Sequence, residues 1–545
     1  MSKSVGAIED HLGTPRGEEE EKMSPESDRG GSDLSSPLLA KELSDKEKMG
    51  VDEMLQRFAG EFGRWQWRHF VLTNLAWALE AFHAMVMIFA DHKPAWRCTA
   101  RAGLGCSPLA ESVCGFEQGS WEWVGGSGLS TVSEWGLVCG NQYKIGLVQS
   151  GFFAGCMVGA GVFGHLSDSF LGRKGSLTLV CAMNLVFGCV TALAPTYWIY
   201  VVLRFLTGFS TGGVGLCSFV LATEPVGPSK RGIAGMSTFY FFSGGIAVLA
   251  AIAYVFPSWR ALYIASSIPS LLFLVAIIPF LSESPRWYLV RGNISNAMKV
   301  MREIANCNGK VLPDNVTLTL DDNSRKCDGP ALQESVSGSI IDVVRSPLTR
   351  IRLVLTVAIN FLTSIVYYGL SLNVVNLGTN LYLNVALNAI AEMPAFALTA
   401  ILIDLFGRKP LTIGTMWFSG VFCVLGSILK SAGISKVAQM VCGILGIFGM
   451  AGTYNLLFIY VAELFPTVVR NAALGCATQS AQMGAILAPL VVVLGGGVPF
   501  AIFGVCGIVG GILSFLLPET FNQPLYDTMA GMEESAHTEH RKEKV

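Results

Sequence analysis

The amino-acid sequence predicts an all-α integral membrane protein that crosses the bilayer about twelve times. Hydrophobic residues make up 51% of the 545 residues, charged residues make up only 14%, and the mean hydropathy is +0.50. A soluble domain usually carries about a quarter charged residues, so this chain has too little polar surface for a water-soluble particle of its size. The net charge of -2 and the lack of a basic stripe argue against a nucleic-acid partner.

Apolar runs of the length that a bilayer requires are the second observation. A hydrocarbon core of ~30 Å is crossed by a helix of about 20 apolar residues. Such runs occur near 70–90, 145–163, 176–194, 197–219, 235–255, 262–281, 352–372, 382–403, 411–430, 437–459, 472–494 and 499–517. The first run begins about seventy residues into the chain and is too long for the core of a signal peptide. We therefore expect no cleaved signal peptide.

Basic residues mark one side of the membrane. Cytosolic loops carry an excess of Lys and Arg, and here the connections after the third, seventh and eleventh spans contain neither. The basic residues fall in the even-numbered connections, counted from a cytosolic N-terminus. They are Arg173, Lys174, Lys230, Arg231, Arg286, Arg291, Arg408, Lys409 and Arg470. Both termini are therefore expected in the cytosol.

Composition divides the chain into five parts. Residues 1–50 hold twelve acidic and seven basic residues with many Ser, Gly and Pro, a mixture too polar to bury a core. The expected parts are a disordered cytosolic tail over 1–65, six-helix halves over 66–281 and 351–520, a polar cytosolic central loop over 282–350, and a cytosolic tail over 521–545.

Three short motifs bear on location. Asp33–Leu39 is similar to an acidic dileucine sorting signal, although a chance match in a low-complexity tail explains it equally simply. It is a hint of a vacuolar rather than a plasma membrane, and the sequence leaves both open. Asn293 and Asn315 lie in sequons of the central loop. A cytosolic loop is not glycosylated, so neither is expected to carry a glycan.

Four cysteines lie in the long connection over 91–143, on the non-cytosolic side of the expected topology. An even number of cysteines in one such loop predicts a two-disulfide framework with three possible connectivities. Zinc binding is the weaker interpretation, because neither the spacing nor the compartment suits it. These cysteines are Cys98, Cys106, Cys114 and Cys139.

The two halves repeat one another. Asp168 through Lys174 returns as Asp404 through Lys409, with the two arginines 235 positions apart. Glu224 with Arg231 returns as Glu463 with Arg470, and Glu283 returns as Glu519. Each half contains six spans, so both enter the membrane from the same side. Such a parallel duplication is typical of transporters whose halves rock about a central site.

Several of these motifs resemble a known family. Gly164–Lys174 resembles the signature loop of the major facilitator superfamily. The overall resemblance to this superfamily covers the chain from about residue 65 to residue 525. Three stretches resemble the organic cation/carnitine transporter family within it, as does the cysteine-bearing first loop. They are Thr131–Cys139, Tyr367–Asn373 and Ala462–Asn471. One departure from the usual pattern is that Asp168 and Gly172 are separated by one additional residue. In this departure the chain is similar to the plant branch of the family.

The duplicated loops are expected to act as gates. A carboxylate and a guanidinium at facing helix ends form strong, often bidentate hydrogen bonds, which can hold one conformation and release in another. Static anchoring by positive charge is the alternative. The gating candidates are Asp168, Arg173, Asp404, Arg408, Glu224, Arg231, Glu463 and Arg470.

Two acids inside the spans predict the charge of the solute. Glu80 and Glu392 lie near the middle of the first and eighth spans, where a charge costs roughly 2.5–3.5 kcal/mol on insertion scales. Such residues usually face a water-filled cavity, and without a matching Lys or Arg they favour a cation or zwitterion. By resemblance, these spans line or flank the cavity, and Glu392 with Pro394 matches the family's Glu-x-Pro site for cation recognition. The alternative is a protonated structural carboxyl.

Four further residues are candidates near that cavity. Tyr367 and Tyr368 can attract an ammonium group through an aromatic face, with one of the two expected to point inward. Gln482 lies at the family position that varies with substrate charge, and here it is neutral. Arg204 resembles the superfamily's arginine on the fourth span, and structural pairing inside the bundle is its expected role.

The sequence therefore predicts a secondary transporter of organic cations or zwitterions such as carnitine, choline or polyamines. No phosphate-binding loop is present, so a gradient, of protons or of sodium ions, is the expected energy source for uphill transport. No cofactor, metal site or enzymatic activity is expected. A sugar or inorganic-anion porter of the same superfamily is the nearest alternative, and a channel is a more distant one.

Overall fold

The computed structural model describes residues 47–99, 106, 113–117, 119–319, 340–377, 379–521, 523 and 532. Chain contacts separate the segment up to Glu47 from a compact unit that begins at Lys48 and contains all of the spans. The dileucine-like stretch Asp33–Leu39 lies outside the described residues. So does the C-terminal tail, apart from residues 521, 523 and 532.

Twelve helices in the described part of the chain are long and apolar enough to cross a membrane, which confirms the predicted number. Four spans are composite. In them α8 (Pro228–Ser237) leads into α9, α10 continues through Phe273–Phe280, a 3-10 turn (Cys139–Asn141) precedes α5, and another (Val374–Asn376) follows α14. The spans are α3 (Arg64–Ala90), α5 (Tyr143–Asp168), α6 (Gly172–Thr191), α7 (Tyr197–Thr223), α9 (Phe239–Val255), α10 (Trp259–Leu272), α14 (Pro347–Asn373), α15 (Leu381–Phe406), α16 (Arg408–Ser431), α17 (Lys436–Leu464), α18 (Thr467–Val493) and α19 (Val498–Phe515).

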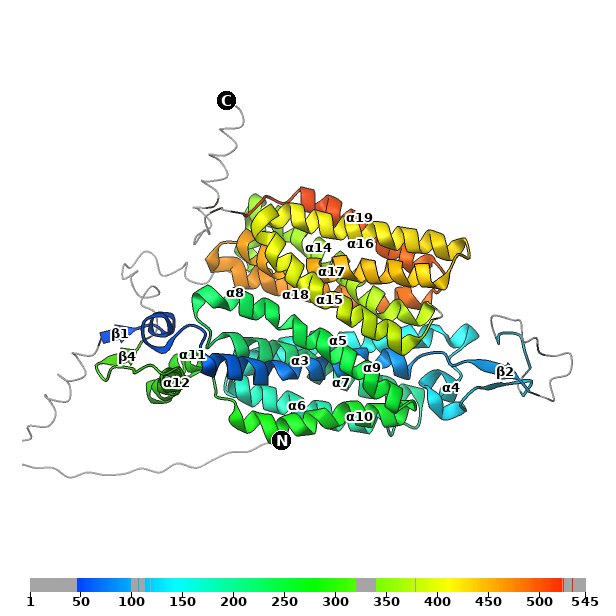
Figure 1. The fold of residues 1–545 in the computed structure, drawn as a ribbon, viewed down its shortest axis with the longest axis horizontal. Coiled ribbons are helices and arrows are strands. Elements are labelled where there is room, and N and C mark those ends of the chain that lie inside the picture. Colours follow the sequence, from blue (N-terminus) through cyan, green and yellow to red (C-terminus); the bar gives the residue numbers. More distant parts are fainter. Residues whose placement is uncertain are drawn as a thin grey trace, which may run out of the picture. The chain divides into compact units, whose positions relative to one another are not determined.

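The spans form two six-helix halves that lie side by side (Figure 1). In the first half α5 packs along α7 at very short range, because glycines remove the side chains between the two backbones. A Cβ at Gly159 would lie only 1.8 Å from the Phe209 carbonyl oxygen. The halves meet mainly where α5 packs on α18 and where α9 packs on α15. The boundary between the halves therefore runs along these two helix pairs.

The two ends of the helix bundle differ in the loops that they carry. The disulfide-loop end carries residues 91–143, with β2 (Trp96–Cys98) antiparallel to β3 (Trp121–Trp123). Its disulfides join Cys98 to Cys106 and Cys114 to Cys139, which selects one of the three predicted connectivities and leaves these sulfurs unable to bind zinc. The duplicated-loop end carries the Asp168–Lys174 and Asp404–Lys409 turns.

The helix α4 (Thr131–Trp135) fastens the disulfide loop to the first half. The Thr131 hydroxyl donates to Asp91 Oδ1 at 2.7 Å. Glu134 accepts bonds from Trp259 Nε1 at 2.7 Å and from the Arg260 guanidinium at 2.5 Å. Much of the family-like stretch Thr131–Cys139 thus holds the loop to the ends of α3 and α10.

The prediction of a disordered tail over 1–65 extends too far along the chain, because residues from Glu47 onward form secondary structure. Two strands, β1 (Glu47–Met49) and β4 (Val316–Leu318), form a sheet, and α2 (Val51–Met54) with the π-helix Leu55–Ala59 packs on α12 (Ile294–Cys307). The central loop over 282–350 likewise contains α11 (Pro285–Val290), α12, β4 and α13 (Ile340–Arg345). Short apolar segments in a polar stretch fold here because they cover one another.

We predict that Gly159→Ala destabilises the first half, since the added Cβ would overlap the Phe209 carbonyl and overpacking costs about 1–3 kcal/mol. The thermal midpoint of the detergent-solubilised protein, followed by fluorescence-detected gel filtration, measures the effect. Gly161→Ala is the matched control, because nothing lies within 4 Å of a Cβ there. Equal midpoints for the two variants would contradict the close packing.

Candidate functional site

Glu392 joins the two halves of the protein. It lies in α15 of the second half and is 1% exposed. Its Oε2 accepts a hydrogen bond of 2.5 Å from the Ser243 hydroxyl of α9, in the first half, and one of 3.2 Å from the Tyr367 hydroxyl of α14. A carboxylate away from water needs such donors, and here one of them comes from the opposite half.

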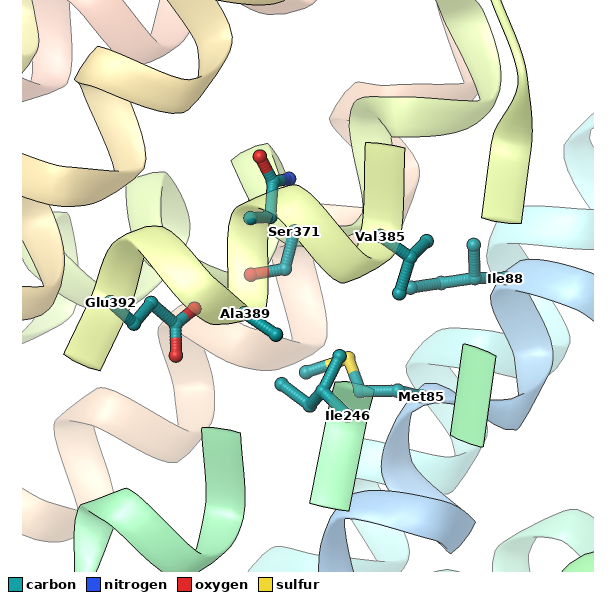
Figure 2. A pocket seen from close by; sticks show the side chains of 8 residues that line it. Met85, Ile88, Ile246, Ser371, Val385, Ala389 and Glu392 are labelled. Carbon is teal, nitrogen blue, oxygen red and sulfur yellow. The ribbon is translucent and has the colours of Figure 1, made fainter. Parts of the chain in front are cut away.

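A small cavity adjoins the Glu392 side chain (Figure 2). Residues from α3, α9, α14 and α15 converge on it, and none of the lining residues is Lys or Arg. The space open to the centre of a water molecule is about 10 Å³, roughly what one water requires. The site in this conformation is therefore closed around the carboxylate. The lining residues are Met85, Ile88, Ile246, Ser371, Val385, Asn388, Ala389 and Glu392.

Tyrosine rings lie beside the carboxylate. Tyr367 stacks on Tyr454 of α17, with ring centroids 5.0 Å apart. Tyr368 packs edge-on against Phe153 of α5, at 4.9 Å, and so contacts the opposite half. Both adjacent tyrosines belong to this aromatic cluster, and neither is among the residues that line the Glu392 cavity. Tyr454 connects the cluster to Phe239 of the first half, at 6.2 Å.

Glu80 lies on α3 of the first half. Among the described residues its Oε2 is buried without a hydrogen-bond partner and faces α7, where a Cβ at Gly215 would come within 2.2 Å. Gln482 is partly buried on α18 and does not line the Glu392 cavity. The structure thus brings Glu392 and both tyrosines to the boundary between the halves, whereas Glu80 faces α7 within the first half and Gln482 stays outside that cavity.

In the first half Arg173 ties several helix ends together. Its guanidinium pairs with Asp168 at 2.9 Å and with Glu224 at 3.0 Å, and donates to the Ser167 carbonyl at 2.8 Å. Glu283, which follows the sixth span, accepts the backbone N–H of Arg173 at 3.1 Å. Burial raises the pKa of Glu283 above its ordinary value, although the backbone N–H groups bonded to it act in the opposite direction.

In the second half Arg408 repeats this arrangement. It makes a bidentate pair with Glu463, at 2.8 and 2.9 Å, and the Thr520 hydroxyl donates to the same carboxylate at 2.6 Å. Glu519 accepts the backbone N–H of Arg408 at 3.0 Å, as Glu283 does for Arg173. The internal repeat in the sequence therefore corresponds to one network built twice.

The comparisons with known proteins agree with this duplicated architecture. The "Sugar (and other) transporter" family matches residues 123–530. Organic cation/carnitine transporter 4 of Arabidopsis thaliana is 66% identical over 95% of this chain and 98% of its own length. This chain belongs to the organic cation/carnitine transporter family. Organic cation/carnitine transporter 2 of the same plant is 32% identical over 91% of this chain and 96% of its own length.

The fold of this organic cation/carnitine transporter family member is that of the major facilitator superfamily. The xylose transporter XylE from E. coli, in a partially occluded inward open conformation, superposes with a TM-score of 0.60 at 15% identity. It covers 84% of this chain and 98% of its own. Family and fold together make this chain a multi-pass membrane transporter rather than an enzyme.

The two copies of the network in this family member are not identical. Asp168 pairs with Arg173, but the exposed Asp404 makes no ion pair among the described residues. Arg231 pairs with Asp52 of the segment before the first span, at 2.6 Å. Burial alone would raise the pKa of Asp52, but the hydrogen bonds and charges of Arg286 and Arg231 hold it below its ordinary value.

Arg470 is the repeat counterpart of Arg231, and its Nε and Nη2 are buried without partners in the described structure. Arg204 lies fully buried inside the first half. Its Nη2 donates to the His83 carbonyl at 2.8 Å, and its guanidinium lies over the rings of Phe152 and Tyr263, at 4.3 and 5.3 Å. Neither arginine lines the Glu392 cavity.

Sequence reasoning missed Ser243, Tyr454 and Asn388 at the site, and Asp52 in the first-half network. Ser243 was detectable as the hydroxyl that interrupts the apolar run of α9. Tyr454 follows the regularly spaced glycines of α17 by two residues, on a span expected to line the cavity. Asp52 carried no local signal, because its partners lie 179 and 234 residues away.

We predict that Glu463→Gln lowers the maximal transport rate about tenfold or more, because Arg408 then loses its charged partner in a partly buried place. Asp404→Asn should leave the rate within about twofold of wild type, since Asp404 makes no ion pair among the described residues. Uptake into proteoliposomes, normalised to inserted protein, measures both. A larger loss for Asp404→Asn than for Glu463→Gln would contradict the importance of the Arg408–Glu463 pair for transport.

Proposed function

We propose that this transporter carries organic cations and that Glu392 is the ligand of the cationic group. The observation that supports the proposal is a carboxylate at the boundary of the two halves, bonded to hydroxyl groups rather than to a Lys or Arg. A permanently paired acid would have little affinity for a second cation. One held by neutral donors keeps its charge available to the solute.

The surroundings of Glu392 favour a cation with an apolar body. Tyr367 and Tyr454 offer aromatic faces, which attract quaternary ammonium groups. The cavity beside Glu392 is lined by neither tyrosine, and its lining is mainly aliphatic. A sugar would require many polar partners, so the sugar-porter alternative is less well supported by this lining.

Carnitine is the second candidate, because the name of the 66% identical Arabidopsis relative includes it. Its carboxylate would need a partner of its own. The buried Arg204 lies inside the first half between aromatic rings, and Gln482 is neutral. A cation without a carboxylate is therefore the favoured substrate, and Glu80 is the proposed second acid along its path.

Alternating access follows from the contacts between the halves. Near the disulfide-loop end, the Ser150 hydroxyl donates to the Ile486 carbonyl at 2.6 Å, and Phe89 stacks on Tyr382 with centroids 5.5 Å apart. These contacts close the boundary on that side of Glu392. We propose that the halves separate there to exchange solute, while the Arg173 and Arg408 networks keep the duplicated-loop ends of each half intact. A proton or sodium gradient is the proposed energy source.

The proposed topology places both termini in the cytosol of a plasma or vacuolar membrane. It rests on the basic residues of the even-numbered connections and on the two disulfides, which persist in oxidising compartments.

We predict that Glu392→Gln lowers cation uptake at least about tenfold, because the neutral amide cannot balance the buried positive charge. Uptake of labelled choline, putrescine, carnitine and glucose into proteoliposomes, with and without a pH gradient, measures this loss and ranks the solutes. Glu53→Gln is the control, since Glu53 pairs with Arg57 on an exposed surface at 2.8 Å. Wild-type uptake by Glu392→Gln would exclude the proposed site, and preference for glucose would exclude the proposed substrate class.

We predict that neither Asn293 nor Asn315 is glycosylated in a eukaryotic host, because both face the cytosol in the proposed topology. A sequon introduced in the exposed stretch 124–128 of the disulfide loop should instead acquire a glycan. Mobility on gels before and after glycosidase treatment distinguishes the two. A glycan on the native central loop would reverse the orientation.

A further inference from the structure

Ser243 and Glu392 form a hydrogen bond that crosses the boundary between the halves at the proposed substrate site. Ser243 is fully buried in α9, and its hydroxyl lies 2.5 Å from Glu392 Oε2. Other hydrogen bonds between the halves have backbone acceptors: Ser150 Oγ donates to the Ile486 carbonyl, and Gln142 Nε2 to the Val493 carbonyl at 3.4 Å. At Ser243 the acceptor is the carboxylate itself.

The contact and a bound cation compete for the space beside the Glu392 carboxylate. Both hydroxyl donors, from Ser243 and Tyr367, reach the same oxygen, Oε2. The adjoining cavity has room for about one water, so an ammonium group with its substituents cannot enter while α9 and α15 keep this spacing. Ile246 of α9 and Ala389 of α15 both line the cavity, one helical turn from Ser243 and Glu392 respectively. Space for the cation therefore has to be made between these two helices.

We propose that the cation displaces the Ser243 hydroxyl from Glu392 and that this exchange uncouples α9 from α15, so that substrate binding itself releases the two halves. Ser243 is a positioning residue that acts through Glu392, and the inference rests on the proposed role of Glu392 as the cation ligand. A ligand shifts a conformational equilibrium only by its difference in affinity between the states. The Ser243 bond supplies that difference, because it occupies the carboxylate in the closed state alone.

The neighbouring contacts have the character that such a release requires. Tyr240 of α9 meets Phe396 of α15 edge-on at 5.5 Å, and Tyr254 meets Tyr382 at 5.7 Å. Aromatic pairs of this kind contribute about 0.5–1.5 kcal/mol each beyond their buried area. The Met393 side chain reaches toward Gly244, where a Cβ would lie 3.9 Å from its terminal carbon. No ion pair holds α9 to α15 in the described structure, so one exchanged hydrogen bond is a large part of the polar link.

The test is a separation of KM from maximal rate in Ser243 variants. We predict that Ser243→Ala lowers the KM for the best-transported cation about tenfold or more, the effect of removing one competing hydrogen bond to a charged group. Ser243→Thr, which restores a hydroxyl, should return the KM toward wild type. Ser150→Ala removes a hydroxyl bond between the halves that does not involve the carboxylate, so its KM should stay unchanged.

The probe is whichever of labelled choline, putrescine and carnitine wild-type protein takes up fastest in the solute panel. Binding of that probe to purified protein in detergent provides a second measurement, because Glu392→Gln is expected to abolish uptake. Ser243→Ala should tighten binding in the wild-type background and have no effect in the Glu392→Gln background. Gel filtration identifies any variant that misfolds, in which case Ser243→Thr and Ser243→Cys carry the comparison.

The possible results separate the inference from the proposed function. If Glu392→Gln abolishes uptake but Ser243→Ala keeps the wild-type KM, the competition is wrong and the cation ligand stands. If Ser243→Ala lowers only the maximal rate, Ser243 has a purely structural role and the inference fails. If Glu392→Gln transports normally, the proposed function fails first, and any effect of Ser243 then belongs to helix packing.

Discussion

In each half one arginine lies where the ends of several spanning helices meet. Arg173 contacts the end of α5 through Asp168 and Ser167 and the end of α7 through Glu224, while its own backbone N–H reaches Glu283 beyond the sixth span. Arg408 does the same with Glu463 and Glu519. Charge-assisted bonds at partly buried sites are strong and directional. They make each half move as one body, so the boundary between the halves is where a large motion can occur.

The boundary itself is held by weaker contacts. It consists of glycines against side chains, aromatic pairs and a few hydroxyl bonds, with Glu392 as the charged group that receives one of them. Each of these contacts contributes little free energy, and equivalent contacts can form after the helices shift. A transporter needs this contrast, because a ligand's binding energy is sufficient to rearrange weak contacts and insufficient to disrupt the networks at the helix ends.

Most of the fold was predictable because lipid imposes length and hydrophobicity on each span. The repeat also indicated which helix ends would carry Arg173 and Arg408. The extra residue between Asp168 and Gly172 was visible in the sequence, but its effect was not. In the first half α5 ends at Asp168 and the turn brings Arg173 back to it, whereas α15 continues past Asp404 to Phe406, and Asp404 makes no ion pair among the described residues. Spacing alone does not show where a helix stops.

The candidate site was predictable only in part. Glu80 and Glu392 stand out because an acid in a span is rare, but the partners of Glu392 come from α9 and α14, far apart in the sequence. A single serine in an apolar run gives no indication of which helix it faces. The same limit applied before the first span, where a polar stretch concealed short segments that fold only against α12 and β4.

That folded segment changes the mechanics of the link between the halves. The polar connection over 282–350 is long, but α11, α12 and β4 within it are bound to the first half. The contacts are made by Asp52, by the β1 strand and by Asn308, whose side-chain amide donates to the Ala59 carbonyl at 2.8 Å. The chain ahead of the first span thus fixes the first part of the connection between the halves to the first half.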